Sequence, residues 1–247
     1  MSTALTDTHC HLAAYPNPVQ ILDDAQAVDV RVVAVSEDPG EYRSLRTRLG
    51  RRDGVSVALG LHPLRAGSSG PHDLARFLRL LPGADWVGEI GLDFSRAGLP
   101  TRRRQLQVFE GILADAQLRT RPVTVHSRGA EKETIGRLTG AGVRAILHWF
   151  TGPLSMAEDA LAAGMYFSVN PAMLRSRSGT ALLRLLPLSR TLLETDGPYS
   201  RAGNRSATPA DLPAVIQTLA KGWEMTTAEA RAVVVGNLRT VAGHELP

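Results

Sequence analysis

Residues 7–12, DTHCHL, contain two histidines, His9 and His11, separated by a single cysteine. Alternate side chains of a β-strand lie on the same face, so the two imidazoles would point to one side and Cys10 to the other. Two neutral imidazoles on one face can bind a divalent cation. They could also be two polar residues that hydrogen-bond to neighbours at the end of a strand. The choice between these interpretations depends on what other ligands the chain provides.

Histidines and carboxylates also stand where other short apolar runs of the sequence end. Five of the seven histidines lie at such ends, and the other two, His72 and His244, lie in segments with a helical pattern. One strand-end histidine alone could be a buried core residue, but four histidines with two carboxylates form a ligand set that is large enough for two ions. The polar strand-end residues are His9, His11, His62, Glu89, Asp93, His126, Arg128, His148, Asn170, Glu194 and Asp196.

Two divalent ions in one site repel each other and need an acidic ligand between them. Some barrel enzymes use a carbamylated lysine for this purpose, but neither Lys132 nor Lys221 ends a predicted strand. Glu89 does end one, so the sequence predicts that Glu89 bridges the two ions.

Eight β-like runs alternate with helical patterns along the chain. Most of the runs are continuously apolar, as expected for parallel strands that are covered on both faces. The clearest helical pattern covers residues 101–119, where Leu106, Phe109, Ile112 and Ala116 repeat at helical spacing. The predicted strands lie near residues 6–11, 30–36, 55–61, 85–91, 122–127, 144–150, 165–170 and 191–196.

This alternation predicts an α/β protein with a (β/α)8 TIM-type barrel, allowing for distortion. The segments TPAD and TTAE resemble capping boxes, and they predict two extra C-terminal helices after the eighth strand. No segment looks like a linker, so residues 1–247 are interpreted as one domain. Enzymes with this fold form their active sites where the strands end, which would bring the strand-end residues together.

The composition is that of an ordinary globular chain with an unusual preference for arginine. Only two of the 28 basic residues are lysines, so 26 are arginines, and the net charge is +4. Arginine suits phosphate recognition, although codon preference could also explain the excess. Arginines recur in the predicted loops that follow strands, namely Arg65, Arg96, Arg128, Arg175, Arg177, Arg201 and Arg205.

The remaining features point to the cytoplasm. The N-terminal residues do not show a basic stretch followed by an apolar run, as a signal peptide would. No apolar run approaches the roughly 18 residues that a membrane helix needs. The single cysteine cannot form an intramolecular disulfide. We therefore expect a cytoplasmic protein with no membrane association.

Six motifs together resemble those of the TatD family of metal-dependent deoxyribonucleases, which belong to the amidohydrolase-like barrels. They are DTHCHL, GLHP, GEIGLD, HSR, HWFTG and ETDGP, and they occur in the family order over residues 7–198. The segments HCHLAAYPNP, LHWFTG and FSVNPAML also resemble the TatD-like nuclease of the Qat anti-phage defence system. Two departures from the family pattern are Trp149, where a cysteine often stands, and the stretched segment RAGNRSATP.

The resemblance implies a role for each strand-end residue. His9, His11 and Asp196 would bind the first ion, and His126 and His148 the second, with Glu89 bridging both. His62 and Arg128 would lie near the scissile phosphate, although a salt bridge to a neighbouring acid is an alternative for Arg128. Further expected substrate contacts are Trp149, which could stack on a base or pack a loop, and Arg201 and Arg205.

We therefore expect a hydrolase that acts on the ester bonds of DNA, exonuclease-like, with two divalent ions (Mg, Mn or Zn) per subunit. The ions would activate water and polarise the phosphoryl oxygen, Asp196 would act as the general base and Arg128 would stabilise the phosphate charge. Two alternatives stay open. One is a small-molecule hydrolase of the amidohydrolase type, acting on an amide, ester or lactone. The other is a non-catalytic subunit of a defence complex, with partner proteins.

Overall fold

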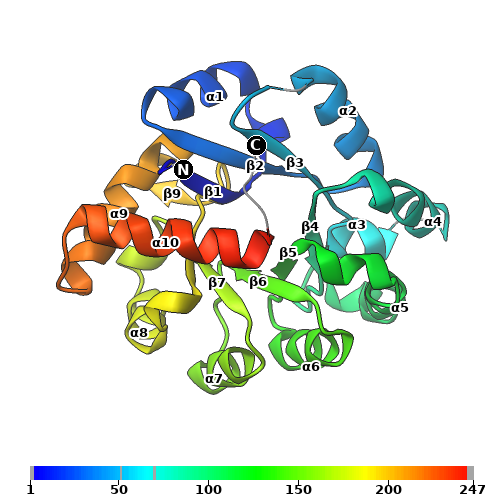
Figure 1. Ribbon diagram of the computed structural model, residues 1–247. Coiled ribbons are helices and arrows are strands. Elements are labelled where there is room, and N and C mark those ends of the chain that lie inside the picture. Colours follow the sequence, from blue (N-terminus) through cyan, green and yellow to red (C-terminus); the bar gives the residue numbers. More distant parts are fainter. Residues whose placement is uncertain (1–2, 51, 69–70, 244–247) are drawn as a thin grey trace. The chain divides into compact units, whose positions relative to one another are not determined.

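The computed structural model describes residues 3–50, 52–68 and 71–243, and its eight main strands form one sheet in chain order, β1 to β8 (Figure 1). The pairs β1–β2, β3–β4, β4–β5, β5–β6 and β7–β8 are parallel. The strands are β1 Leu5–Cys10, β2 Val30–Val35, β3 Val55–Leu59, β4 Trp86–Gly91, β5 Pro122–His126, β6 Arg144–His148, β7 Tyr166–Val169 and β8 Thr191–Leu193.

Helices follow the strands in the order that the sequence predicts. They are α1 Pro18–Ala27, α2 Pro39–Leu49, α3 Pro63–Ser68, α4 Pro71–Leu80, α5 Arg102–Leu113, α6 Glu131–Ala141, α7 Leu154–Ala162, α8 Arg177–Leu185, α9 Leu212–Gly222 and α10 Thr227–Ala242. A short hairpin, β9 Arg201–Ala202 with β10 Arg205–Ser206, lies between β8 and α9.

The first and last strands of the sheet are neighbours, as a (β/α)8 fold requires. The Thr8 hydroxyl donates to the carbonyl of Leu193 at 2.9 Å. Beyond the end of β8, the amide of Asp196 donates to the carbonyl of His9, also at 2.9 Å. The predicted fold class is confirmed by the strand order and by these contacts.

The chain divides into two compact units. The first comprises Met1–Ala34, Arg52–Ser56 and Phe167–Pro247, and the second comprises Val35–Arg51 and Val57–Tyr166. The interpretation of residues 1–247 as one domain stays a prediction. His244 lies outside the described residues, and His72 lies on α4 with its side chain exposed.

The observed elements correct the predicted ones in three places. Most strands end one to three residues earlier than predicted, so His11 and Asp196 lie just beyond a strand rather than in it. The predicted helix 101–119 ends at Leu113, because the Asp115 carboxylate accepts from the Gln117 amide at 2.9 Å and starts a separate 3₁₀ turn. Helix α3 is additional; its sequence lacks the apolar periodicity that predicts a helix.

The core of the second unit lies between its strands and helix α5. The side chains of Trp86 and Phe77 are completely buried, and that of Phe109 is 1% exposed. Helix α5 buries Val108, Phe109 and Ile112 on one face and contacts α3, α4 and α6. This packing fixes β4 and β5, the two strands that carry Glu89 and His126.

The two C-terminal helices complete the first unit. Figure 1 shows α9 and α10 in orange and red, and both contact β1 and β8. The side-chain amide of Asn237 donates to the carbonyls of Leu188 (2.6 Å) and Thr191 (2.8 Å), which ties α10 to the start of β8. The helix begins with the predicted capping box, in which the Glu229 carboxylate accepts from the Thr226 amide at 2.8 Å and the Thr226 hydroxyl accepts from the Glu229 amide at 3.2 Å.

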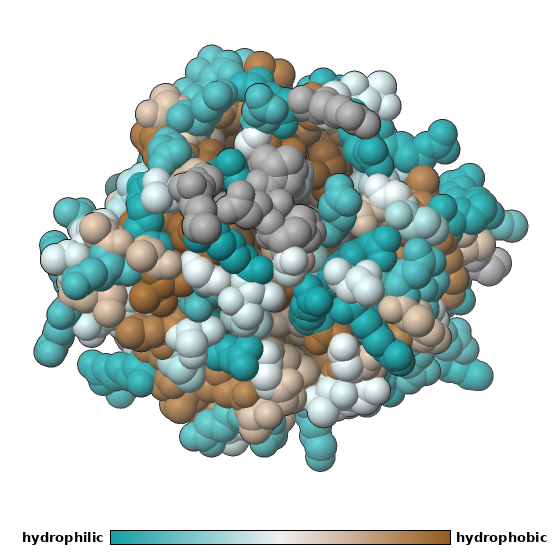
Figure 2. All heavy atoms as spheres, viewed as in Figure 1, coloured by the Kyte–Doolittle hydropathy of each residue, from teal (hydrophilic) through white to brown (hydrophobic). Residues whose placement is uncertain are grey.

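Within the described part of the chain, no helix is both long and apolar enough to cross a membrane. Hydrophilic side chains occupy much of the face that Figure 2 shows, and hydrophobic ones form smaller patches between them. Six large hydrophobic residues are exposed among those described: Val19, Val28, Leu64, Leu99, Leu154 and Tyr199.

Replacing Thr226 with alanine is expected to lower the free energy of unfolding by about 1 kcal/mol, because the first turn of α10 loses its cap. For a chain of this size the melting temperature should fall by roughly 2–4 °C. Thr218→Ala is the matched control, since that exposed threonine lies inside α9 and caps nothing. Equal melting temperatures for the two variants would show that the cap does not stabilise the fold.

Candidate metal centre

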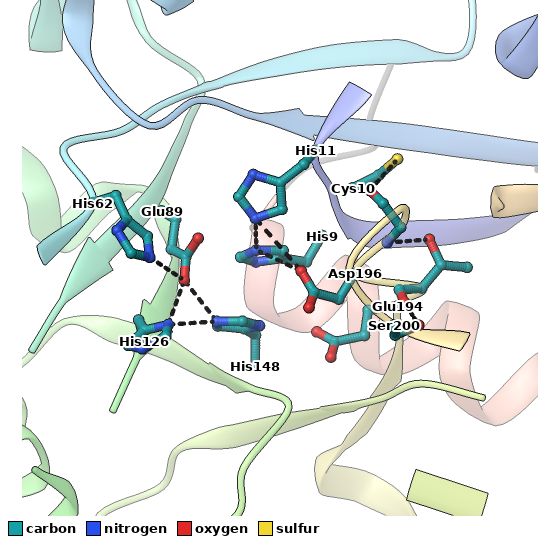
Figure 3. Close-up of polar contacts among 12 residues, drawn as sticks. His9, Cys10, His11, His62, Glu89, His126, His148, Glu194, Asp196 and Ser200 are labelled. Carbon is teal, nitrogen blue, oxygen red and sulfur yellow. Dashed lines mark hydrogen bonds and ion pairs between the residues drawn. The ribbon is translucent and has the colours of Figure 1, made fainter. Parts of the chain in front are cut away.

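In the first unit, His9, His11 and Asp196 bring their ligand atoms together (Figure 3). The Nε2 atoms of His9 and His11 are 3.3 Å apart, and they lie 3.7 and 3.5 Å from Asp196 Oδ1. All three residues are buried, with exposures of 0%, 5% and 4%. Two imidazole nitrogens and a carboxylate oxygen that point at one another form a donor set that suits a divalent cation.

The backbone of β1 and of the segment after β8 fixes this group. The amide of His11 donates to the carbonyl of Gly197 at 2.9 Å. The buried Asp7 carboxylate accepts from the amides of His9 (3.2 Å) and Thr195 (2.9 Å), and also from the Thr195 hydroxyl. Asp7 therefore holds the two ligand-bearing segments together. Burial raises the pKa of Asp7 to about 7, although its hydrogen bonds to Thr195 oppose the rise.

In the second unit, three imidazoles surround one carboxylate oxygen, as the dashed lines in Figure 3 show. Glu89 Oε1 lies 2.7 Å from His126 Nδ1, 2.8 Å from His148 Nε2 and 3.6 Å from His62 Nε2. Glu89 is 1% exposed. His62, Glu89 and His126 also have the spacing of a metal-ligand group. Three nitrogens and one oxygen again match the ligands of zinc, manganese or iron.

Two glycines shape β4 around Glu89. Gly88 has a φ of 152° and Gly91 a φ of 136°, values that side chains of L-residues rarely allow. A Cβ atom at Gly88 would also overlap the hydroxyl of Thr124, and one at Gly91 would overlap the carbonyl of His126. The two glycines therefore let β4 approach β5 closely enough for Glu89 and His126 to meet.

A second carboxylate orients His126 from behind. While His126 Nδ1 faces Glu89, its Nε2 lies 2.9 Å from Asp93 Oδ2. Asp93 is itself fixed, since its Oδ1 accepts from the Ser95 amide and its own amide donates to Gln105 Oε1, both at 2.8 Å. A carboxylate on the outer nitrogen of a ligating histidine sets its tautomer and its ring orientation.

Opposite effects determine the charge on His126 in the metal-free protein. Burial by itself would lower the pKa of His126, but the hydrogen bonds to Asp93 and Glu89 outweigh it and raise the pKa to about 9. Burial likewise opposes the hydrogen bonds from His126 and Ser95 at Asp93, whose pKa nonetheless falls to about 2. A proton on His126 therefore occupies the position where a cation would bind.

The comparisons with known proteins agree with this geometry. The family model of TatD related DNase matches residues 6–243, almost the whole chain. The chain belongs to the TatD family. The predicted enzyme class, a metal-dependent hydrolase that acts on ester bonds, is thereby confirmed.

Relatives and solved structures of the TatD family cover most of the chain. Deoxyribonuclease TATDN3 of Homo sapiens is 35% identical over 214 aligned residues, and the match covers 78% of each protein. The metal-dependent hydrolase YcfH of Escherichia coli (strain K12) is 32% identical over 212 aligned residues, and the match covers 79% of this chain and 78% of the relative. The crystal structure of YJJV, a TatD homologue from Escherichia coli K12, matches 100% of both chains with a TM-score of 0.88 at 23% identity, which shows the shared fold.

In this TatD-family protein, the residues predicted to contact the substrate differ in their exposure and in the partners that they bind. Arg128 is exposed and makes no ion pair with any described residue; β5 ends at His126, two residues earlier, so strand alternation does not define the direction of its side chain. The Arg205 guanidinium forms a two-point ion pair with Asp211, and Arg201 donates to the carbonyl of Asn204. Trp149 is half-buried with a φ of 36°, which is rare for a bulky residue.

The sequence does not assign a role to two residues that lie beside the metal ligands, Asp93 and Tyr199. Asp93 is one of the polar strand-end residues, and the structure places its carboxylate beside His126 Nε2. Tyr199 was not predicted, although its ring lies beside His11 with 4.8 Å between ring centroids. The only signal for Tyr199 is its place three residues after Asp196.

Replacing Asp93 with asparagine should weaken metal binding by roughly 10- to 100-fold, because the outer partner of His126 loses its charge. The measurement is a metal titration of the folded variant, with melting temperature as a check on the fold. Asp85→Asn is a suitable control, since Asp85 is an exposed acid of the same unit that precedes β4. A folded Asp93→Asn protein with wild-type metal affinity would contradict the orienting role.

Metal binding should release a proton from His126 at pH 7, because the metal-free imidazole titrates at about pH 9. The apparent affinity should therefore rise by up to roughly tenfold per pH unit between pH 7 and 9, and level off above that range. Calorimetric titrations in buffers of different ionisation enthalpy would count the released protons. An affinity that does not change over this range would show that no protonated ligand is displaced.

Proposed function

We propose that this protein is a deoxyribonuclease that hydrolyses phosphodiester bonds with two divalent ions. The observation that carries the proposal is the presence of a histidine–carboxylate group in each unit, one around Asp196 and one around Glu89. His9, His11 and Asp196 would hold the first ion. Glu89, His126 and His148 would hold the second, and Glu89 would bridge the two.

The donor sets fit such ions, because imidazole nitrogens and carboxylate oxygens converge in both groups. This mixture suits zinc, manganese or iron better than magnesium, which prefers oxygen ligands alone. When bound, the ions would lower the pKa of the attacking water and polarise the phosphoryl oxygen.

The chain's own residues would supply the remaining steps. Asp196 would accept the proton of the attacking water as general base. His62, half-buried and 3.6 Å from Glu89 Oε1, would lie at the phosphate or serve as a further ligand of the second ion. Arg128 would bind the phosphate, since its exposed guanidinium can grip two oxygens at once and makes no ion pair with any described residue.

DNA as the substrate is supported by the relatives. Both the matching family and the human relative carry deoxyribonuclease in their names. The arginine-rich composition fits a polyanionic ligand. Cleavage from a strand end, location in the cytoplasm and a role in anti-phage defence with partner proteins are the wider parts of this proposal, supported by the sequence alone.

The direct test is digestion of end-labelled single- and double-stranded DNA with added Zn²⁺, Mn²⁺ or Mg²⁺ and with a chelator. The wild type should cleave only with metal, and Glu89→Gln should abolish cleavage while the fold survives, because a neutral amide bridges two cations poorly. Turnover of Glu89→Gln equal to that of the wild type would refute the bridging role. Hydrolysis of amides, esters or lactones with none of DNA would favour the small-molecule alternative.

Replacing Arg128 with alanine should leave the metal content and the melting temperature unchanged but lower kcat. Loss of one donor to the charge of the transition state costs roughly 100- to 1000-fold. Arg96→Ala is the control, since Arg96 belongs to a neighbouring loop and is expected to matter less. A metal-replete Arg128→Ala enzyme with near-normal cleavage would show that Arg128 does not bind the phosphate.

A further inference from the structure

The ring of Tyr199 is exposed beside a predicted metal ligand. Tyr199 is 54% exposed, a value shared by only one other large hydrophobic residue among those described, Leu99. Its ring meets the imidazole of His11 edge to face, at 4.8 Å between centroids and with 70° between the ring planes. One side of the Tyr199 ring is therefore in contact with a predicted metal ligand, while about half of the residue is exposed to solvent.

The backbone that carries this ring is fixed to the same group. The amides of Tyr199 and Ser200 both donate to the carbonyl of Asp196, at 2.9 and 3.0 Å. Ser200 is completely buried; its hydroxyl donates to the carbonyl of Thr195 and its carbonyl accepts from the Ala207 amide. The ring thus projects from a turn that is anchored on both sides, so contact with a ligand would cost little further backbone ordering.

Tyr199 is more exposed than the two aromatic residues that follow the end of β6, of which Trp149 is half-buried. Phe150 is only 3% exposed, so it cannot present a ring face to a ligand. Tyr199 is followed by the exposed Arg201, which adds positive charge within two residues of the ring. An open aromatic face beside positive charge is the arrangement that binds single-stranded nucleic acid.

We propose that the ring of Tyr199 is a binding site for a nucleobase of the strand that is cut. The inference rests on the proposed deoxyribonuclease function and adds a base site to it. The base would stack on the solvent-facing side of the ring, while the opposite contact with His11 keeps the ring in place. Every base has a π-face, so the site would tolerate all four bases. A base that stacks on Tyr199 must first unstack from its neighbours in the DNA duplex. The enzyme should therefore prefer single strands or frayed ends.

The test is a double-mutant cycle between the ring and the base. Cleavage by the wild type, Tyr199→Ala and Tyr199→Phe is measured on single-stranded oligonucleotides that carry a tetrahydrofuran abasic residue at one of the three positions nearest the cleaved bond. On the intact strand, Tyr199→Ala should lower kcat/KM by roughly 5- to 150-fold, and Tyr199→Phe should stay near the wild type. At one abasic position, the difference between the wild type and Tyr199→Ala should disappear.

The controls separate a base site from a structural role. Leu99→Ala removes an equally exposed side chain of the other unit and should not alter cleavage. The metal content of Tyr199→Ala should equal that of the wild type. An equal loss on the intact strand and on all three abasic strands, or a loss of metal, would overturn the base site and show that the ring acts only through His11. Absence of DNA cleavage by the wild type would instead refute the proposed function, and the base site with it.

Discussion

A carboxylate oxygen enclosed by imidazoles is the interaction around which the second unit is organised. Glu89 Oε1 has three histidine nitrogens between 2.7 and 3.6 Å away, in a setting that exposes only 1% of the residue. A buried carboxylate is costly unless positive charge compensates it. In the metal-free protein that charge is a proton on His126, whose pKa is about 9. A divalent ion would replace the proton and contribute more charge to the same atoms.

In the first unit, buried carboxyl groups beside the ligands reduce the stability of the fold at neutral pH. Asp7 and Glu194 are completely buried, and burial raises the pKa of both carboxyl groups. For a raised carboxyl pKa, the neutral form is favoured in the folded state, so stability is highest below the unfolded value and declines as pH rises through the folded one. For Asp7 this window runs from about pH 4 to about pH 7. Glu194 is hydrogen-bonded to Ser168 and Asn170, which makes Asn170 part of this buried network.

The sequence predicts the eightfold strand order because burial on both faces leaves long apolar runs, and it predicts the ligand groups because parallel strands end at one edge. It fails where a side chain's partner lies elsewhere in the chain. Nothing local indicates that Asp93 reaches His126, which lies 33 residues further along the chain. It also fails at exact strand ends, which hydrogen bonding determines, so the direction of Arg128 could not be read from alternation.

The central claim is that the two histidine–carboxylate groups each hold one divalent ion. The most direct measurement is the metal content per chain, by elemental analysis and native mass spectrometry after purification with added Zn²⁺ or Mn²⁺. The account predicts two ions in the wild type, and one fewer in folded His11→Ala and in folded His148→Ala proteins. A wild type that binds no metal, or variants that both keep two ions, would contradict it.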